Sequence, residues 1–168
     1  MGNGGQTASP KVHPEESIFL MSVVRRFPGG VTEGHLQTVI FAGQRLRLIP
    51  ARYEFLFQEL VPFCEELDFR IAKLVWSGGV FIHDNRLRAG PHPGGWDAIR
   101  AAAESKRLDK LIELSYDSLK FLAAALHLEQ DLQKSRPEAV QTARRFFSVQ
   151  AAAFDYERWL EEKCPQKF

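Results

Sequence analysis

The sequence predicts a mainly α-helical protein with a small β wing. Apolar residues recur with the 3.6-residue period of a helix through most of the 168 residues, whereas only two short stretches have the features of strands. Stretches rich in glycine and proline separate the elements, and the clearest of them spans residues 90–95. These observations predict three parts: a disordered leader at 1–13, a folded N-terminal part at 14–89, and a C-terminal helical extension, packed on it, at 96–164.

Two helices are expected in the first 50 residues. The leader is rich in Gly, Ser, Thr, Gln and Pro and offers nothing to bury, so the first helix should begin at Pro14, and it should end at Phe27. Thr32 is placed to cap a second helix. The residues expected to face the core are Ile18, Met21 and Val24 in the first helix, and Leu36, Val39, Ile40, Gly43 and Leu46 in the second.

A strand, a third helix and a hairpin should follow. Residues 53–57 alternate with a period of two, which is typical of a short strand, and Pro62 argues against a strand that continues further. The third helix should open at Pro62 or Cys64 and end at residues 78–79, with carboxylates in its first turn. Residues 80–88, with a turn at Asp84 and Asn85, predict the wing.

The remainder of the chain is expected to be helical. A short helix should span 96–104 and a longer one 116–133, which is apolar on two sides and should therefore be packed from two sides. Ser135 and Glu138 have the spacing of a capping box at the start of the next helix. A last helix should follow Ser148, with Ala152, Tyr156 and Leu160 inward, and end before Pro165.

Helix, helix, strand, helix and wing is the order of a winged-helix domain, and three runs carry a closer likeness. They are Leu-Gln-Thr-Val-Ile-Phe at 36–41, Arg-Tyr-Glu-Phe at 52–55, and Pro-Phe-Cys-Glu-Glu-Leu at 62–67, followed by Arg70 and Ile71. In this order they resemble the YwgA family of small bacterial winged-helix proteins, which is similar in turn to the Panacea group with its SocA-like antitoxins. The resemblance covers about residues 15–88.

The resemblance implies a winged-helix fold and a role in toxin neutralisation or defence, and it implies no catalytic residues. One departure stands out. The family loop reads Tyr-Gly-Pro-Tyr-Ser, whereas residues 58–64 of this chain are longer and lack the glycine.

Composition argues against several classes of function. The chain has 22 basic and 21 acidic residues, and the balance is nine to nine between residues 15 and 88, so the winged part is not basic enough to favour nucleic acid. No apolar run approaches the ~20 residues that span a bilayer, and no secretory signal is evident. We therefore expect a cytoplasmic protein without membrane contact.

No motif in the sequence indicates catalysis. A nucleophile elbow, a phosphate-binding loop and a dinucleotide fingerprint are all absent. Cys64 and Cys164 are too isolated for a zinc site or a disulfide framework. His83, Asp84 and His92 are the only local grouping of metal-ligand types, and we interpret them as part of a solvated wing and linker. We expect no enzyme activity, no cofactor and no metal.

The third helix decides between two kinds of partner. In a DNA-binding winged helix it enters the major groove, but here residues 65–77 carry only Arg70 and Lys73 against three carboxylates. Phe69, Ala72 and Trp76 form a second apolar stripe on its DNA-facing side. Something should cover this stripe: the C-terminal helices of the chain, another protein chain, or DNA.

These arguments predict a non-enzymatic protein-interaction module or accessory subunit, antitoxin-like or part of a bacterial defence or regulatory complex. Its partner would be another protein chain, in a homodimer or a complex. The alternative is a winged-helix DNA-binding transcriptional regulator, favoured by fold analogy alone. The predicted partner-binding residues are Phe69, Ala72, Lys73 and Trp76; the predicted nucleic-acid contacts under the alternative are Arg45, Arg47, Arg86 and Arg88, joined by Arg25 and Arg26.

Overall fold

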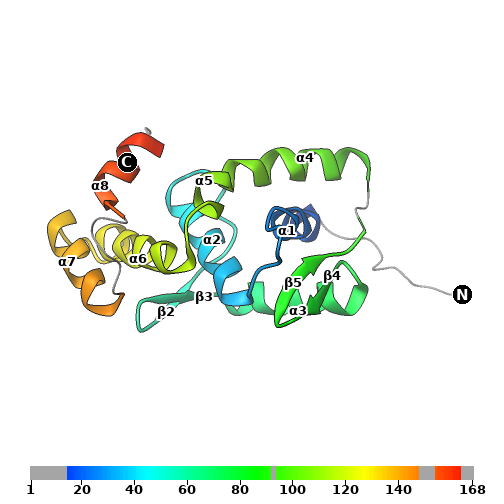
Figure 1. The fold of residues 1–168 in the computed structure, drawn as a ribbon, viewed down its shortest axis with the longest axis horizontal. Helices are drawn as coiled ribbons and strands as arrows, with labels where there is room; N and C mark the ends of the chain where they lie inside the picture. The colour runs from blue at the N-terminus through cyan, green and yellow to red at the C-terminus, as the bar shows by residue number, and fades with distance from the viewer. Residues whose placement is uncertain (1–14, 92–93, 148–153, 164–168) are drawn as a thin grey trace, which may run out of the picture. The chain divides into compact units, whose positions relative to one another are not determined.

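The structure, a computed structural model, describes residues 15–91, 94–147 and 154–163 (Figure 1). It is mainly helical and contains two small antiparallel sheets of two strands each, which confirms the predicted fold class. No helix in the described part of the chain is both long and apolar enough to cross a membrane. The predicted leader, Ala152, His92 and Cys164 lie outside the described residues.

The chain forms two compact units. The first contains the residues up to Val31 and Phe69–Lys106, and the second contains Thr32–Asp68 and the residues from Arg107 onward. Each unit draws residues from both sides of the glycine-proline linker at 90–95. The linear division expected at that linker remains a prediction.

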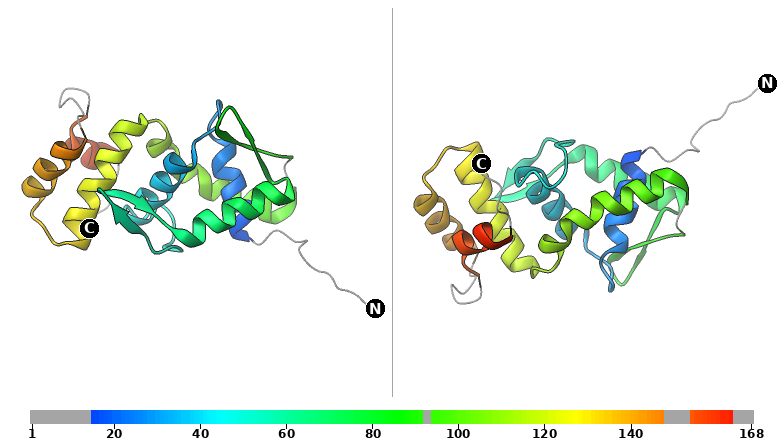
Figure 2. Two further views of the ribbon diagram at one scale, coloured as in Figure 1. Left: turned by 90° about the horizontal axis from the view of Figure 1, so that it is seen from below. Right: turned by 90° about the horizontal axis from the view of Figure 1, so that it is seen from above.

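The first unit is built around α1. Its elements are α1 (Glu15–Arg25), most of α3 (Glu65–Ser77), β4 (Val80–His83), β5 (Arg86–Ala89) and α4 (Gly95–Ser105). Figure 1 shows α1 between α4 on one side and α3 with the β4–β5 hairpin on the other, and α3 lies in front of α1 when seen from below (Figure 2, left). The three residues predicted to face inward on the first helix are buried.

The β4–β5 hairpin confirms the predicted wing. Asp84 and Asn85 form its turn with φ angles of 53° and 65°, a conformation that aspartate and asparagine adopt more readily than other non-glycine residues. Val31 forms an isolated bridge with Leu87, so that the segment after α1 extends the hairpin. On the other side of α1, Ser22 and Ser105 share a buried hydrogen bond of 2.9 Å that links α1 to α4.

The second unit contains α2 and most of the C-terminal helices. Its elements are α2 (Glu33–Arg45), β2 (Leu56–Gln58), β3 (Val61–Phe63), α5 (Asp109–Ile112), α6 (Tyr116–Leu126), a π-helical turn (His127–Asp131), α7 (Arg136–Phe146) and α8 (Tyr156–Lys163). Thr32 caps α2 as predicted, because its hydroxyl oxygen accepts a hydrogen bond from the His35 amide at 3.3 Å. The predicted apolar stripe of α2 is buried.

The β2–β3 hairpin differs from the prediction. Strand pairing begins at Leu56 rather than Tyr53. The strand does not continue to Pro62, as expected, because β2 ends at Gln58, but Pro62 lies in a second strand, β3, opposite Phe57, which was not predicted. Proline is tolerated in a strand that has no hydrogen-bonded neighbour on its other side. The turn residues Glu59 and Leu60 have φ angles of 51° and 63°, which such residues rarely adopt, so the sequence carried no turn signal.

Three helices of the C-terminal part match their predictions in different degrees. The helix α4 confirms the short helix expected at 96–104, and α6 is buried on both sides as expected. However, α6 ends at Leu126 and continues as the π-helical turn, so the regular helix predicted to residue 133 is too long. The Ser135 hydroxyl oxygen accepts the Glu138 amide hydrogen at 3.3 Å, which confirms the serine half of the capping box.

Candidate protein-interaction surface

The two sides of α3 have opposite environments. Ile71 and Leu74 are buried, while Phe69 is 63% and Trp76 is 90% exposed. Ala72 and Lys73 are also exposed, and the Lys73 ammonium nitrogen lies 5.3 Å from the centre of the Phe69 ring. The structure thus brings the four predicted partner-binding residues together on one solvent-facing side of α3, which we call the α3 surface.

The described chain leaves the α3 surface largely uncovered. Which of the three possible covers, the C-terminal helices, another protein chain or DNA, lies on this stripe stays a prediction. Burial of a large apolar side chain contributes about 1.5–3 kcal/mol. Trp76 provides little of this contribution to the fold and Phe69 only part of it, so the remainder is available for binding.

Further apolar side chains in the first unit are exposed, and none of them was predicted from the sequence to be functional. Phe81 and Ile82 are exposed on β4, which directly follows α3 in the chain. Trp96 and Ile99 are exposed on α4, one helical turn apart. The continuous run Val80-Phe81-Ile82, apolar without alternation, was the signal for the β4 pair. The helical spacing of Trp96 and Ile99 was the signal for the α4 pair.

The charges of α3 are poorly suited to DNA. Glu65, Glu66 and Asp68 occupy its first turn. Arg70 forms an ion pair with Glu16 of α1 at 3.3 Å, so part of its charge is compensated within the protein. Lys73, packed over a phenyl ring, remains as the exposed cation of this helix. A duplex is held mainly by cationic side chains at its phosphates, and α3 supplies few of them.

The arginines predicted to contact nucleic acid are divided between the two units. Arg45 and Arg47 belong to the second unit, and Arg86 and Arg88 to the first. Arg45 binds Asp131 with an Nη2–Oδ2 distance of 3.0 Å. Arg86 donates a hydrogen bond from Nη1 to the Gly30 carbonyl oxygen at 3.3 Å. Two of the four side chains are thus engaged within the protein.

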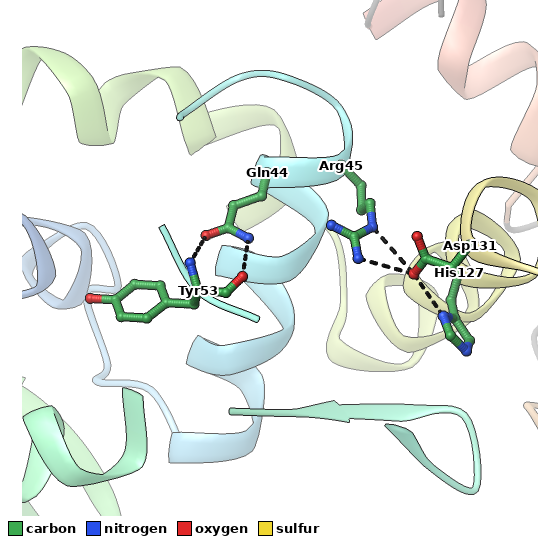
Figure 3. Close-up of polar contacts among 5 residues, drawn as sticks. All are labelled: Gln44, Arg45, Tyr53, His127 and Asp131. Carbon is green, nitrogen blue, oxygen red and sulfur yellow. Dashed lines mark hydrogen bonds and ion pairs between the residues drawn. The ribbon is translucent and has the colours of Figure 1, made fainter. Parts of the chain in front are cut away.

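A polar cluster that the sequence analysis missed joins α2 to the π-helical turn (Figure 3). The Asp131 carboxylate accepts Arg45 and also lies 2.8 Å from Nδ1 of His127. The imidazole of His127 stacks on Phe57 of β2, with ring centres 3.6 Å apart. The π-helical turn places His127 and Asp131, four residues apart, within hydrogen-bonding distance. The Arg45 guanidinium compensates the charge of the Asp131 carboxylate. The cluster thereby links α2 to the π-helical turn within the second unit.

A second polar contact fixes the segment before β2. The Gln44 amide nitrogen donates to the Tyr53 carbonyl oxygen at 3.0 Å, and its amide oxygen accepts the Tyr53 amide hydrogen at 3.1 Å (Figure 3). The side chain of Gln44 therefore takes the role of a neighbouring strand. The backbone of Tyr53 is thus hydrogen-bonded and buried although it pairs with no strand of the described chain.

Two carboxyl groups meet where α2 and α3 begin. Burial, a hydrogen bond with Asp68 and the charge of Asp68, in that order of size, together raise the pKa of Glu33 from 4.5 to about 7. The Glu33 carboxyl group therefore keeps its proton over much of the range below neutrality. Glu33 and Asp68 are 35 positions apart in the sequence, so no local sequence pattern indicates that they form a pair.

The metal-ligand grouping considered in the wing is small. Nε2 of His83 lies 3.3 Å from the Asp84 carboxylate. Within the described residues, no group of three or more His, Cys, Asp or Glu side chains could hold a metal ion. Cys64 is buried, and its sulfur accepts a hydrogen bond from the Leu67 amide at 3.4 Å, so its thiol caps the start of α3.

The fold and the surface together define a mainly α-helical protein with a β wing and an exposed aromatic helix. No protein-family model, curated protein or solved structure matches the chain. The exposed residues of the α3 surface are therefore the features of the molecule that indicate a function.

Proposed function

We propose that this protein is a non-enzymatic interaction module or accessory subunit that binds another protein chain through the α3 surface. The observation that carries the proposal is the 90% exposure of Trp76, with Phe69 two turns before it on the same side of α3. Tryptophan is among the residues most enriched at binding hot spots, and charged residues are depleted from the centres of such interfaces. The α3 surface has this composition.

The partner is a second copy of this chain or a subunit of a complex. An antitoxin-like or defence role in a bacterial cytoplasm, which the likeness to the YwgA and Panacea proteins implies, belongs to this proposal. The α3 surface supports it only as far as a protein partner is concerned. DNA binding is the competing function, and the acidic first turn of α3 disfavours it.

The mass of the protein in solution tests the proposal first. We expect Trp76→Ser to remain folded by circular dichroism, because its side chain contributes little to the core. If the wild type is a dimer by light scattering, Trp76→Ser should be monomeric. Trp96→Ser is the matched control, since Trp96 is a tryptophan of similar exposure on α4, and it should remain dimeric.

If the wild type is a monomer, a photo-reactive phenylalanine analogue at position 76 tests for a different protein partner. We expect one defined cross-linked protein that is lost when Lys73→Glu is added, and no such product from position 96. Cross-links to DNA, together with duplex binding that weakens steeply with salt and requires Arg86 and Arg88, would replace this proposal by the transcriptional regulator.

A further inference from the structure

A pocket in the second unit lies between the start of α2 and the β2–β3 hairpin. Its volume is about 450 Å³, within the range of typical ligand pockets. The helix and the hairpin both line it, through Glu33, Gly34 and Gln37 of α2 and Gln58, Glu59, Val61, Pro62 and Phe63 of the hairpin. None of the residues predicted from the sequence as functional lies in this lining.

The hairpin supplies an apolar wall that continues outside the pocket. Val61, Pro62 and Phe63 line the pocket. Phe63 pairs directly with Leu56 across the hairpin, so their side chains lie on the same face of the sheet. Phe63 is 43% and Leu56 is 72% exposed. An apolar pair at the rim is therefore open to a group that extends beyond the pocket.

The charged residues of the pocket lining are all acidic. Glu33 lies on the helix side and Glu59 on the hairpin side, and Asp68 forms a hydrogen bond with Glu33. Among the residues that the structure describes, no lysine or arginine lines the pocket. Two hydrogen bonds fix the elements that line the pocket. The Gln37 side-chain oxygen of α2 accepts the Cys64 amide hydrogen at 2.7 Å, and Thr32 caps the start of α2.

We propose that this pocket binds a lysine or arginine side chain of a partner polypeptide, with an adjacent apolar residue of that polypeptide packed on Leu56 and Phe63. The methylene stem of such a side chain suits the apolar wall, while its charged end reaches a carboxylate. Charge-assisted hydrogen bonds to Glu59, and to Glu33 once it is ionised, then fix the basic group. The proposal does not depend on the α3 surface, which lies on other residues.

The rim distinguishes a polypeptide from a free amine. A small amine satisfies the two glutamates but leaves Leu56 and Phe63 exposed to water. A polypeptide carries its second, apolar group on the same chain, so the two contacts are made together at little additional entropic cost. The occupant that uses every feature of this site is a segment in which a basic residue adjoins an apolar one.

Nuclear magnetic resonance titration of the full chain tests the proposal. The probes are a capped Gly-Lys-Leu-Gly peptide, the same peptide with glutamate in place of lysine, and n-butylamine, each at low salt and at about pH 8, where Glu33 is ionised. We expect saturable shifts of the backbone signals at the start of α2 and in the hairpin with the lysine peptide, no such shifts with the glutamate peptide, and weaker binding of n-butylamine.

Matched variants distinguish binding in this pocket from non-specific attraction of a cation to acidic residues elsewhere on the surface. The double variant Glu33→Gln with Glu59→Gln should weaken binding of the lysine peptide about tenfold. Glu54→Gln with Glu65→Gln removes the same charge from exposed positions outside the pocket lining and should leave binding unchanged. The amide spectrum of each variant reports whether it is folded.

Several results would overturn the proposal. They are the absence of saturable shifts with the lysine peptide, equal shifts with the glutamate peptide, equal weakening in both double variants, and binding of n-butylamine as tight as that of the peptide. The last result would leave a site for small amines only. Trp76→Ser should bind the lysine peptide like the wild type, so that failure here and failure of the α3 proposal are distinguishable.

Discussion

Replacing Glu33 by glutamine should stabilise the protein at alkaline pH. Burial and the neighbouring Asp68 hold the pKa of Glu33 at about 7, whereas the unfolded chain releases this proton near 4.5. The folded state therefore binds the proton more tightly between these two values. Folding stability from this group is fully present below pH 4.5 and is lost as the pH rises to about 7. Glutamine resembles the protonated side chain and has no proton to lose.

The size of the effect follows from the two pKa values. The difference between 4.5 and about 7 corresponds to about 3 kcal/mol. Because Glu33 is only partly buried, solvent screening reduces the expected effect to about 1–2 kcal/mol. The stability of Glu33→Gln relative to the wild type should therefore increase by this amount from acidic to alkaline pH.

Urea unfolding of both proteins at about pH 5 and about pH 8 measures this difference. Glu54→Gln is the control, since Glu54 is an exposed glutamate of the same unit and should change stability by about the same amount at both pH values. Asp68→Asn should reproduce part of the effect, because it removes the charge that raises the pKa of Glu33. If Glu33→Gln and the wild type have parallel pH profiles, the pKa of Glu33 is not raised in the folded protein.

Two further pairs of variants test the packing of the first unit by thermal or urea unfolding. Leu74→Ala should lower the free energy of unfolding by about 2–4 kcal/mol because Leu74 is buried. Trp76→Ser should change the free energy of unfolding by less than about 0.5 kcal/mol. Similar losses in the two variants would place Trp76 in the core. Gly90→Ala should cost about 2 kcal/mol because its Cβ atom would overlap the Gly78 carbonyl oxygen. Gly29→Ala meets no atom within 4 Å and should be nearly neutral, so equal effects would refute the packing around Gly90.

The helices could be predicted because their signals are local. Apolar residues at helical spacing identified the buried side of α2, and the hydroxyl of Thr32 marked its start. The wing could be predicted because Asp84 and Asn85 favour the positive φ angles of a two-residue turn. In each case the residues that determine the structure lie within a few positions of it.

The β2–β3 hairpin and the π-helical turn could not be predicted in this way. Glu59 and Leu60 are poor residues for positive φ angles, and the packing of β3 on α2 holds them there instead. Arg45, 86 residues before Asp131, contributes to the cluster that anchors the π-helical turn. Both elements depend on contacts between distant segments, which period and propensity do not reveal.

The candidate sites, too, could be predicted only as far as their residues lie close together in the sequence. Sequence spacing placed Phe69, Ala72 and Trp76 on one side of α3, but their exposure depends on what the rest of the chain covers. The pocket beside β2–β3 was invisible, because Glu33 and Glu59 come together only after the hairpin forms. A sequence can thus indicate an apolar stripe, whereas its role follows from the packed structure.

The two sides of α3 allow stability and binding to be changed separately. Leu74 contributes to the core, so its replacement acts on the folded state and reduces binding only by lowering the amount of folded protein. Trp76 lies almost wholly in solvent, so its replacement leaves folding unchanged and removes contact area from a complex. A partner that binds α3 must therefore distinguish these two variants at equal concentrations of folded protein, and one that does not distinguish them binds elsewhere.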